Sequence, residues 1–234
     1  PTTFDELIRI SGLSHGTDVW LGNAQSLIEA GTVTLQDSIC CRDDIMIYLI
    51  KQGLPPNPAF KIMETVRKGK ALKDPAKWEE YKTLMKEHNV PEWYIKSCEK
   101  IKYMFPKAHA AAYVTNAFRI AWFKVHIPLA YYAAYYSIRA KAFDAEFMIN
   151  GKERAKNKMK EIEMKNQKKE ATKAELDMYD DLEIVLEMYE RGFEFLPVDI
   201  YESDATKFKI QDDKLRPPLN SIAGFGTVAA QGIV

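Results

Sequence analysis

The chain has 234 residues, and its 33 lysine and arginine residues balance 33 aspartate and glutamate residues. With 47% hydrophobic and 28% charged residues, the composition is that of a globular protein with room for one large domain or two small ones. The balance excludes a chain that is basic or acidic throughout, and no uncharged apolar run reaches the roughly 20 residues that a membrane-spanning helix needs.

Short helices are predicted over the first 90 residues, separated by glycine, proline and polar turns. Acids or proline at the helix starts, and glycine or cations at the ends, indicate their bounds. The cations Arg67 and Lys68 at the end of one helix either complement its dipole or contact phosphate groups. The helices are expected close to residues 5–10, 20–30, 43–50, 58–68 and 73–89.

Three cysteines, Cys40, Cys41 and Cys98, do not have the spacing of a disulfide framework or a zinc knuckle. A reducing, cytoplasmic setting is therefore expected. The chain starts with proline and ends in apolar residues, which favours a piece cut from a longer polypeptide.

Residues 100–143 differ from the rest of the chain. These 44 positions contain no aspartate or glutamate, seven lysine or arginine residues and 11 of the 27 aromatic residues. Positive charge combined with aromatic rings is the combination that holds phosphates and bases. The segment therefore predicts a surface for a nucleotide or a nucleic acid.

A helix of about 21 residues is predicted from Pro106 to Pro128, because proline suits a helix start and alanines propagate the helix. Lys107 and His109 would lie in its first turn, where the helix dipole favours an anion. Tyr113 follows His109 on the same line, so a polyphosphate at the helix start and a base one turn later would fit. The alternative is a buried helix whose His109 and Tyr113 bond internally. Four tyrosines at 131–136 are interpreted as core.

The last third of the chain alternates in charge. Residues 152–173 hold nine cations and four acids, and residues 177–190 hold six acids and no cation, which predicts two exposed helices that attract each other. Short strands with a tight turn are expected near residues 193–197 and 208–215. Gly224 and Gly226 precede a helix-like run and could form a turn around a phosphate. A second, smaller domain is expected to begin near residue 146.

Several catalytic patterns are missing from the sequence. There is no phosphate-binding P-loop, no nucleophile elbow and no strand-borne pair of aspartates for two metal ions. A complete active site is therefore not expected within these residues.

Long motifs resemble the fingers of bacterial C-family replicative DNA polymerases of the PolC type. The resemblance covers essentially the whole chain. The motifs that carry it run over residues 9–20, 41–46, 105–113, 119–129 and 217–226.

The resemblance implies a mainly α fold, with a fingers domain over residues 1–145. Residues 146–234 would be a small α+β segment that starts an incomplete helix-hairpin-helix domain for duplex DNA. The parent would be a DNA-directed DNA polymerase whose Mg²⁺ ligands lie in a palm domain outside this chain. Its partners would be template-primer DNA, a dNTP, the palm and thumb of the same chain and the sliding clamp, with no membrane.

The resemblance also assigns site residues. Those near the incoming nucleotide would be Lys107, His109, Tyr113, Ser11, Ser14, His15 and Arg42. The candidates for DNA contacts are Arg67, Lys68, Arg119, Lys124, Gly224 and Gly226. No catalytic residue and no metal ligand is expected here, and the segment 150–174 is richer in lysine than is usual for the type. A non-enzymatic helical DNA-binding module and a helical scaffold are the alternatives.

Overall fold

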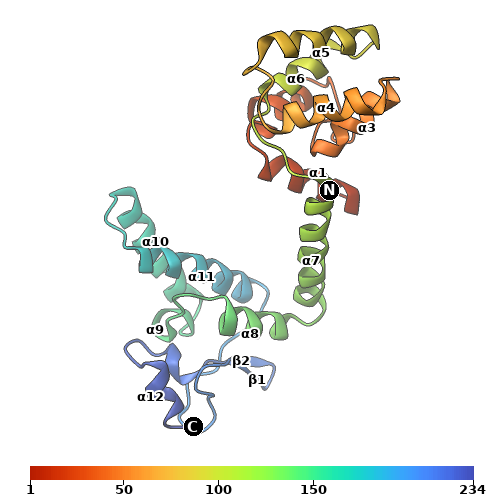
Figure 1. Ribbon diagram of the computed structural model, residues 1–234. Helices are drawn as coiled ribbons and strands as arrows, with labels where there is room; N and C mark the ends of the chain where they lie inside the picture. The colour runs from red at the N-terminus through yellow and green to blue at the C-terminus, as the bar shows by residue number, and fades with distance from the viewer. The chain divides into compact units, whose positions relative to one another are not determined.

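The computed structural model describes all 234 residues and divides them into two compact units, Pro1–Phe118 and Arg119–Val234 (Figure 1). The fold is mainly α, as predicted, with twelve α-helices and one two-stranded sheet. Along the chain, the boundary between the units falls within helix α7 (Lys107–His126). This division describes packing, and the functional division between residues 145 and 146 stays a prediction.

Unit 1 is a set of short helices. They are α1 (Phe4–His15), a π-helical turn η1 (Trp20–Ala24), α2 (Gln25–Glu29), α3 (Arg42–Lys51), α4 (Pro56–Arg67), α5 (Pro75–Glu87), α6 (Glu92–Lys100) and the first part of α7.

Unit 2 contains the rest of α7 and the remaining elements. They are α8 (Pro128–Ile138), α9 (Ala145–Met148), α10 (Lys152–Gln167), α11 (Lys173–Glu190), β1 (Lys209–Gln211), β2 (Lys214–Arg216), a 3₁₀ turn η2 (Leu219–Ser221) and α12 (Thr227–Gln231). No helix combines the length and the apolarity that crossing a bilayer requires.

Local chemistry explains most helix starts. Thr3 and Glu6 form a capping box at α1, and α5 begins behind the side chain of Asp74, which accepts from the Lys77 amide. Helix α4 begins at Pro56, two residues before the predicted Pro58, and proline is suited to either position.

The helix predicted over residues 20–30 is wrong as a single element. Leu21 has an extended backbone and Gly22 has a φ of 64°, so the chain kinks within η1, before the regular turns of α2. The ammonium of Lys100 donates to the Gly22 carbonyl oxygen over 2.7 Å. This contact comes from a residue 78 positions away, and the local sequence pattern could not predict it.

The core of unit 1 lies between α3 and α4 and their neighbours. Ile45, Leu49, Ile62 and Val66 are fully buried in it. All three cysteines are buried and unpaired, and burial raises the pKa of the Cys40 thiol to about 11. Cys40, Cys41 and Cys98 are thus thiols packed within the core.

Unit 2 has its own core. Tyr132 and Tyr136 are buried in it together with Phe195 and Phe208, which confirms the core interpretation of these two tyrosines. The strands predicted around residues 208–215 form an antiparallel hairpin in which Ile210 faces Leu215. Its turn consists of Asp212 and Asp213 with φ of 52° and 55°, the conformation of a two-residue hairpin turn. The strand predicted near residues 193–197 is wrong, because there only Phe195 forms an isolated bridge, to Leu215.

Gly12 provides a test of the unit 1 packing. A Cβ atom at this position would lie 2.6 Å from the Cys41 Sγ and 2.7 Å from the Cys40 carbonyl oxygen. Gly12→Ala is expected to lower the free energy of unfolding by about 1–3 kcal/mol, because the backbone of α1 must move away. Thermal unfolding measures this. Gly226→Ala is the control, because its Cβ would meet nothing within 4 Å, and equal stability of the two variants would contradict the packing account.

Candidate nucleotide and DNA interface

The start of α7 is fixed by contacts with α3. The Asp43 Oδ2 accepts a hydrogen bond from the Lys107 amide over 2.6 Å, and the Arg42 amide donates to the Phe105 carbonyl oxygen over 3.1 Å. The helix therefore begins one residue after Pro106 and ends before Pro128, as predicted. Asp43 supplies the side-chain cap that the segment around Pro106 lacks.

The Lys107 side chain is held by α1. Its Nζ lies 3.0 Å from the Asp5 Oδ1, and 35% of the side chain is exposed. Hydrogen bonds from Arg9 and Lys107 lower the pKa of the Asp5 carboxyl. Residues 100–143 contain no acid, but acids from other helices contact them. Asp5 accepts a hydrogen bond from the Lys107 ammonium, and Asp43 accepts one from the Lys107 amide, which is the first amide of α7.

Aromatic rings form a row beside the start of α7. The rings of Phe105 and His109 stack at a centroid distance of 4.9 Å, and His109 meets Tyr113 at 4.6 Å. Tyr103 and His15 contact Phe105 edge to face. Tyr113 is 64% exposed, so an aromatic face is open to a ligand, which a buried helix would not offer.

This row brings together three predicted site residues, His15, His109 and Tyr113. Sequence reasoning missed Tyr103 and Phe105 as its other members. The four-residue spacing of Phe105, His109 and Tyr113 was the signal that could have found Phe105, which lies two residues before the first residue of α7.

Ser11, Ser14 and His15 lie at the end of α1. The Ser11 carbonyl oxygen accepts from the Ser14 hydroxyl over 3.1 Å and lies 2.8 Å from the His15 Nδ1. The close approach of Gly12 to the segment of Cys40 and Cys41 positions this end of the helix. His15 connects the three residues to the aromatic row through Phe105.

Three predicted cations gather around one carboxylate, Glu64. Arg67 forms a close ion pair with it, Lys68 Nζ lies 2.7 Å from its Oε2, and Arg42 Nη1 lies 3.8 Å from its Oε1. Hydrogen bonds from Arg67 and Lys68 lower the pKa of Glu64 to about 2. Asp43 Oδ2 also lies 3.9 Å from the Arg42 Nε, so three cations face two acids and leave a small local excess of positive charge. The buried Arg42 Nε has no hydrogen-bond partner.

The predicted DNA contacts of unit 2 have different environments. Arg119 is exposed and forms no ion pair, whereas Lys124 pairs with Glu187 over 2.7 Å and lies over the Tyr131 ring. Gly224 has a φ of 78°, and it lines, with Gly226 and the start of α11, a concave surface of about 500 Å³. Arg119 is thus the more available of the two cations for a phosphate.

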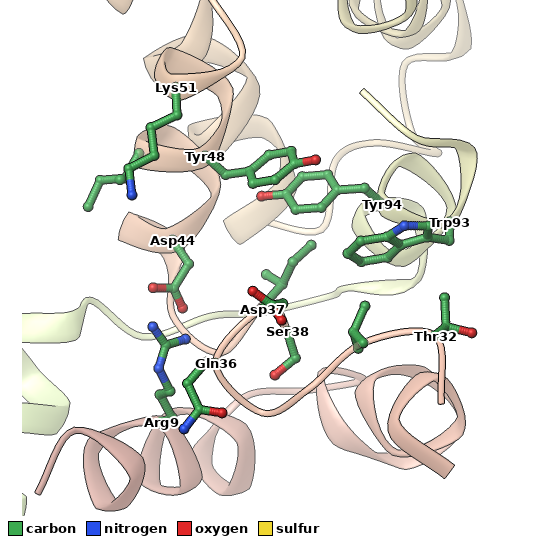
Figure 2. Close-up of a pocket in the computed structure, with 13 residues that line it drawn as sticks. Arg9, Thr32, Gln36, Asp37, Ser38, Asp44, Tyr48, Lys51, Trp93 and Tyr94 are labelled. Carbon is green, nitrogen blue, oxygen red and sulfur yellow. The ribbon is translucent and has the colours of Figure 1, made fainter. Parts of the chain in front are cut away.

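A cavity of about 410 Å³ in unit 1 contains none of the predicted site residues (Figure 2). Tyr48 and Tyr94 stack on one side of it at a centroid distance of 4.1 Å, and Trp93 meets Tyr94 edge to face. Arg9 and Lys51 also line the cavity. No sequence pattern indicated this cavity, because its walls come from four separate segments of the chain.

Residues 1–89 match the family described as the bacterial DNA polymerase III alpha subunit finger domain. The whole chain aligns with proteins named DNA polymerase III PolC-type, at 58% identity in Streptococcus suis (strain 98HAH33), 57% in Streptococcus sanguinis (strain SK36) and 56% in Streptococcus pyogenes serotype M5 (strain Manfredo). The chain spans 16% of the length of these relatives. The resemblance found in the sequence motifs is confirmed.

The cluster at Glu64 predicts an acid-dependent stability. The pKa of the Glu64 carboxyl in the folded state, about 2, lies below the ordinary value of 4.5. The ion pairs of Glu64 therefore stabilise the fold fully above about pH 4.5, and this stabilisation is lost as the pH falls towards 2. The free energy of unfolding of the wild type should therefore exceed that of Glu64→Gln at pH 6 by more than at pH 2.5.

Urea unfolding at a series of pH values measures this difference. Glu87→Gln is the control, because Glu87 is exposed and forms no ion pair. A pH-independent difference for Glu64→Gln would contradict the assignment of these ion pairs.

Proposed function

We propose that this chain is the fingers part of a PolC-type replicative DNA polymerase and binds the incoming dNTP and the template-primer for magnesium-dependent nucleotidyl transfer. The observation that carries this proposal is the 56–58% identity to PolC-type polymerases over the full chain. The match of residues 1–89 to a finger domain supports the assignment of this part of the chain.

The nucleotide would bind at the start of α7. A triphosphate would compete with Asp5 for the Lys107 ammonium, and the exposed Tyr113 ring would contact the base or the sugar. The positive end of the helix dipole adds to the attraction, although Asp43 already occupies the first amide. Lys107 would then neutralise charge that develops on the triphosphate as pyrophosphate leaves.

The other predicted residues would extend this site. Ser11, Ser14 and His15 would reach it through the contact of His15 with Phe105. Arg42 would reach it through the hydrogen bond that its backbone amide donates to the Phe105 carbonyl oxygen. The predicted DNA contacts are in both units, and the phosphate backbone is their expected ligand. They are Arg67, Lys68, Arg119, Lys124, Gly224 and Gly226.

Polymerase chemistry implies a divalent metal ion, and we propose Mg²⁺. No group of three or more histidine, cysteine, aspartate or glutamate side chains in the structure could hold a metal ion, so its ligands would belong to the palm, outside these residues. When bound, the ion would stabilise the negative charge of the transferred phosphoryl group.

The remaining partners follow from the same assignment. They are the palm and thumb of the polymerase polypeptide and, through regions outside this chain, the sliding clamp. The cytoplasm would be the compartment. A non-enzymatic helical DNA-binding module is the second candidate, which the excess of cations around Glu64 favours.

Lys107→Ala in the complete polymerase should weaken the use of nucleotides far more than DNA affinity. We expect kcat/KM for a matching dNTP to fall at least about tenfold, since a charge-assisted bond to a phosphate contributes roughly 1.5–3 kcal/mol. The Kd for template-primer should change less than about twofold. Steady-state kinetics and equilibrium DNA binding measure the two quantities.

Asp5→Asn is the matched control, because it breaks the same ion pair and keeps the ammonium. Its KM for the dNTP should not rise above that of the wild type. Unchanged nucleotide kinetics in Lys107→Ala would contradict the proposed nucleotide site, and salt-dependent DNA binding with no effect of a matching dNTP would favour the DNA-binding module instead.

A further inference from the structure

Helices α10 and α11 pack together and neutralise part of each other's charge. Lys152 Nζ lies 2.6 Å from the Glu190 Oε1, and Lys165 Nζ lies 2.6 Å from the Glu175 Oε1. These pairs lie at the two ends of the helix pair. The Lys152–Glu190 pair confirms the predicted attraction between the basic and the acidic segment, whereas Glu175 lies just before the acidic segment 177–190. The two pairs account for only some of the cations of residues 152–173.

The nine cations of this segment divide into those that form an ion pair and those that form none. Five form ion pairs with neighbouring acids, and four, all exposed, form none. The paired ones are Lys152, Arg154, Lys156, Lys158 and Lys165. The four without an ion pair are Lys160, Lys168, Lys169 and Lys173.

Three of these unpaired lysines surround the connection between the two helices. Lys168 and Lys169 follow α10, and Lys173 is the first residue of α11. We call these three residues the lysine loop. Glu170 is the only acid between Lys168 and Lys173, and it forms no ion pair. The lysine loop therefore exposes more positive than negative charge.

The backbone of the lysine loop is held in a defined shape. Lys169 has a φ of 60°, and the Glu170 amide donates to the Lys165 carbonyl oxygen over 2.9 Å. Thr172 forms a capping box with Glu175 at the start of α11. The lysines are thus carried by a folded connection rather than by a disordered charged tail.

The residue types around these lysines indicate the kind of ligand. Protein interfaces are enriched in aromatic residues and arginine and depleted in lysine, and residues 168–173 contain no aromatic residue and no arginine. Lysine binds phosphate groups as a point charge. A phosphate-rich backbone therefore fits this surface better than a protein partner does.

The lysine loop adjoins the surface that holds two predicted DNA contacts. Ala174 and Glu175, directly after Lys173, line the concave surface of about 500 Å³ that also contains Gly224 and Gly226. That surface has no lysine or arginine in its lining and has the acids Asp144 and Glu175. The positive charge beside it therefore comes from the lysine loop.

We propose that the lysine loop binds phosphate groups of the DNA backbone, as a contact separate from the nucleotide site. The inference rests on the proposed function, in which the complete polymerase binds template-primer DNA. The contact would be independent of base sequence, because phosphates carry no sequence information directly.

The test compares salt dependence in the complete polymerase. A Lys168→Ala, Lys169→Ala, Lys173→Ala variant should bind template-primer more weakly at low salt. The slope of log K against log salt concentration should be smaller by about 2–3, since each phosphate contact accounts for roughly 0.9 in that slope. The loss should be the same for template-primers of different sequence.

A second variant with the same change in charge is the control. It carries Lys152→Ala, Lys156→Ala and Lys158→Ala, which remove cations of α10 that are already paired with acids, and its slope should stay within about 0.5 of the wild-type slope. Circular dichroism verifies that both variants fold.

A wild-type slope in the lysine-loop variant, or an equal reduction in both variants, would overturn the inference and leave the proposed function standing. If the wild-type polymerase showed no salt-dependent binding of template-primer, the proposed function itself would fail, and the inference with it.

Discussion

The hydrogen bond between the Asp43 carboxylate and the Lys107 amide is the contact on which the account of the site depends. It fixes the first residue of α7, with support from the bond between the Arg42 amide and the Phe105 carbonyl oxygen. Because side chains four residues apart lie on one face of a helix, this start places His109 and Tyr113 side by side. Phe105, two residues before the helix, stacks on His109 and extends the row. A helix starting elsewhere would separate Lys107 from its neighbours.

Electrostatics at the site are more balanced than the acid-free segment suggests. Asp5, Asp43 and Glu64 come from α1, α3 and α4 and neutralise several of the cations that would meet phosphates. An anionic ligand must therefore compete with carboxylates that are already in place. Such competition makes binding depend on the geometry of the ligand as well as on its charge, because a cation already paired with a carboxylate gains less from a poorly placed anion.

Features governed by neighbouring residues were predictable from the sequence. The bounds of α7, the Asp212–Asp213 hairpin turn and the buried Tyr132 and Tyr136 follow from proline, turn and periodicity rules. Contacts between distant segments were not predictable. Glu64 forms ion pairs with cations of two helices. The cavity beside Tyr48 is lined by residues of α1, α3, α6 and the segment after α2. Neither feature produces a periodic pattern in the sequence.

The most direct test of the nucleotide site is lysine modification of the complete polymerase, followed by mass spectrometry. The amine of Lys107 should react readily in the binary complex with template-primer, and a matching dNTP should protect it at least about fivefold, whereas a mismatched dNTP should not. Exposed Lys96 should react equally in every state. Equal modification of Lys107 with and without the matching dNTP would contradict the central claim that the start of α7 receives the triphosphate.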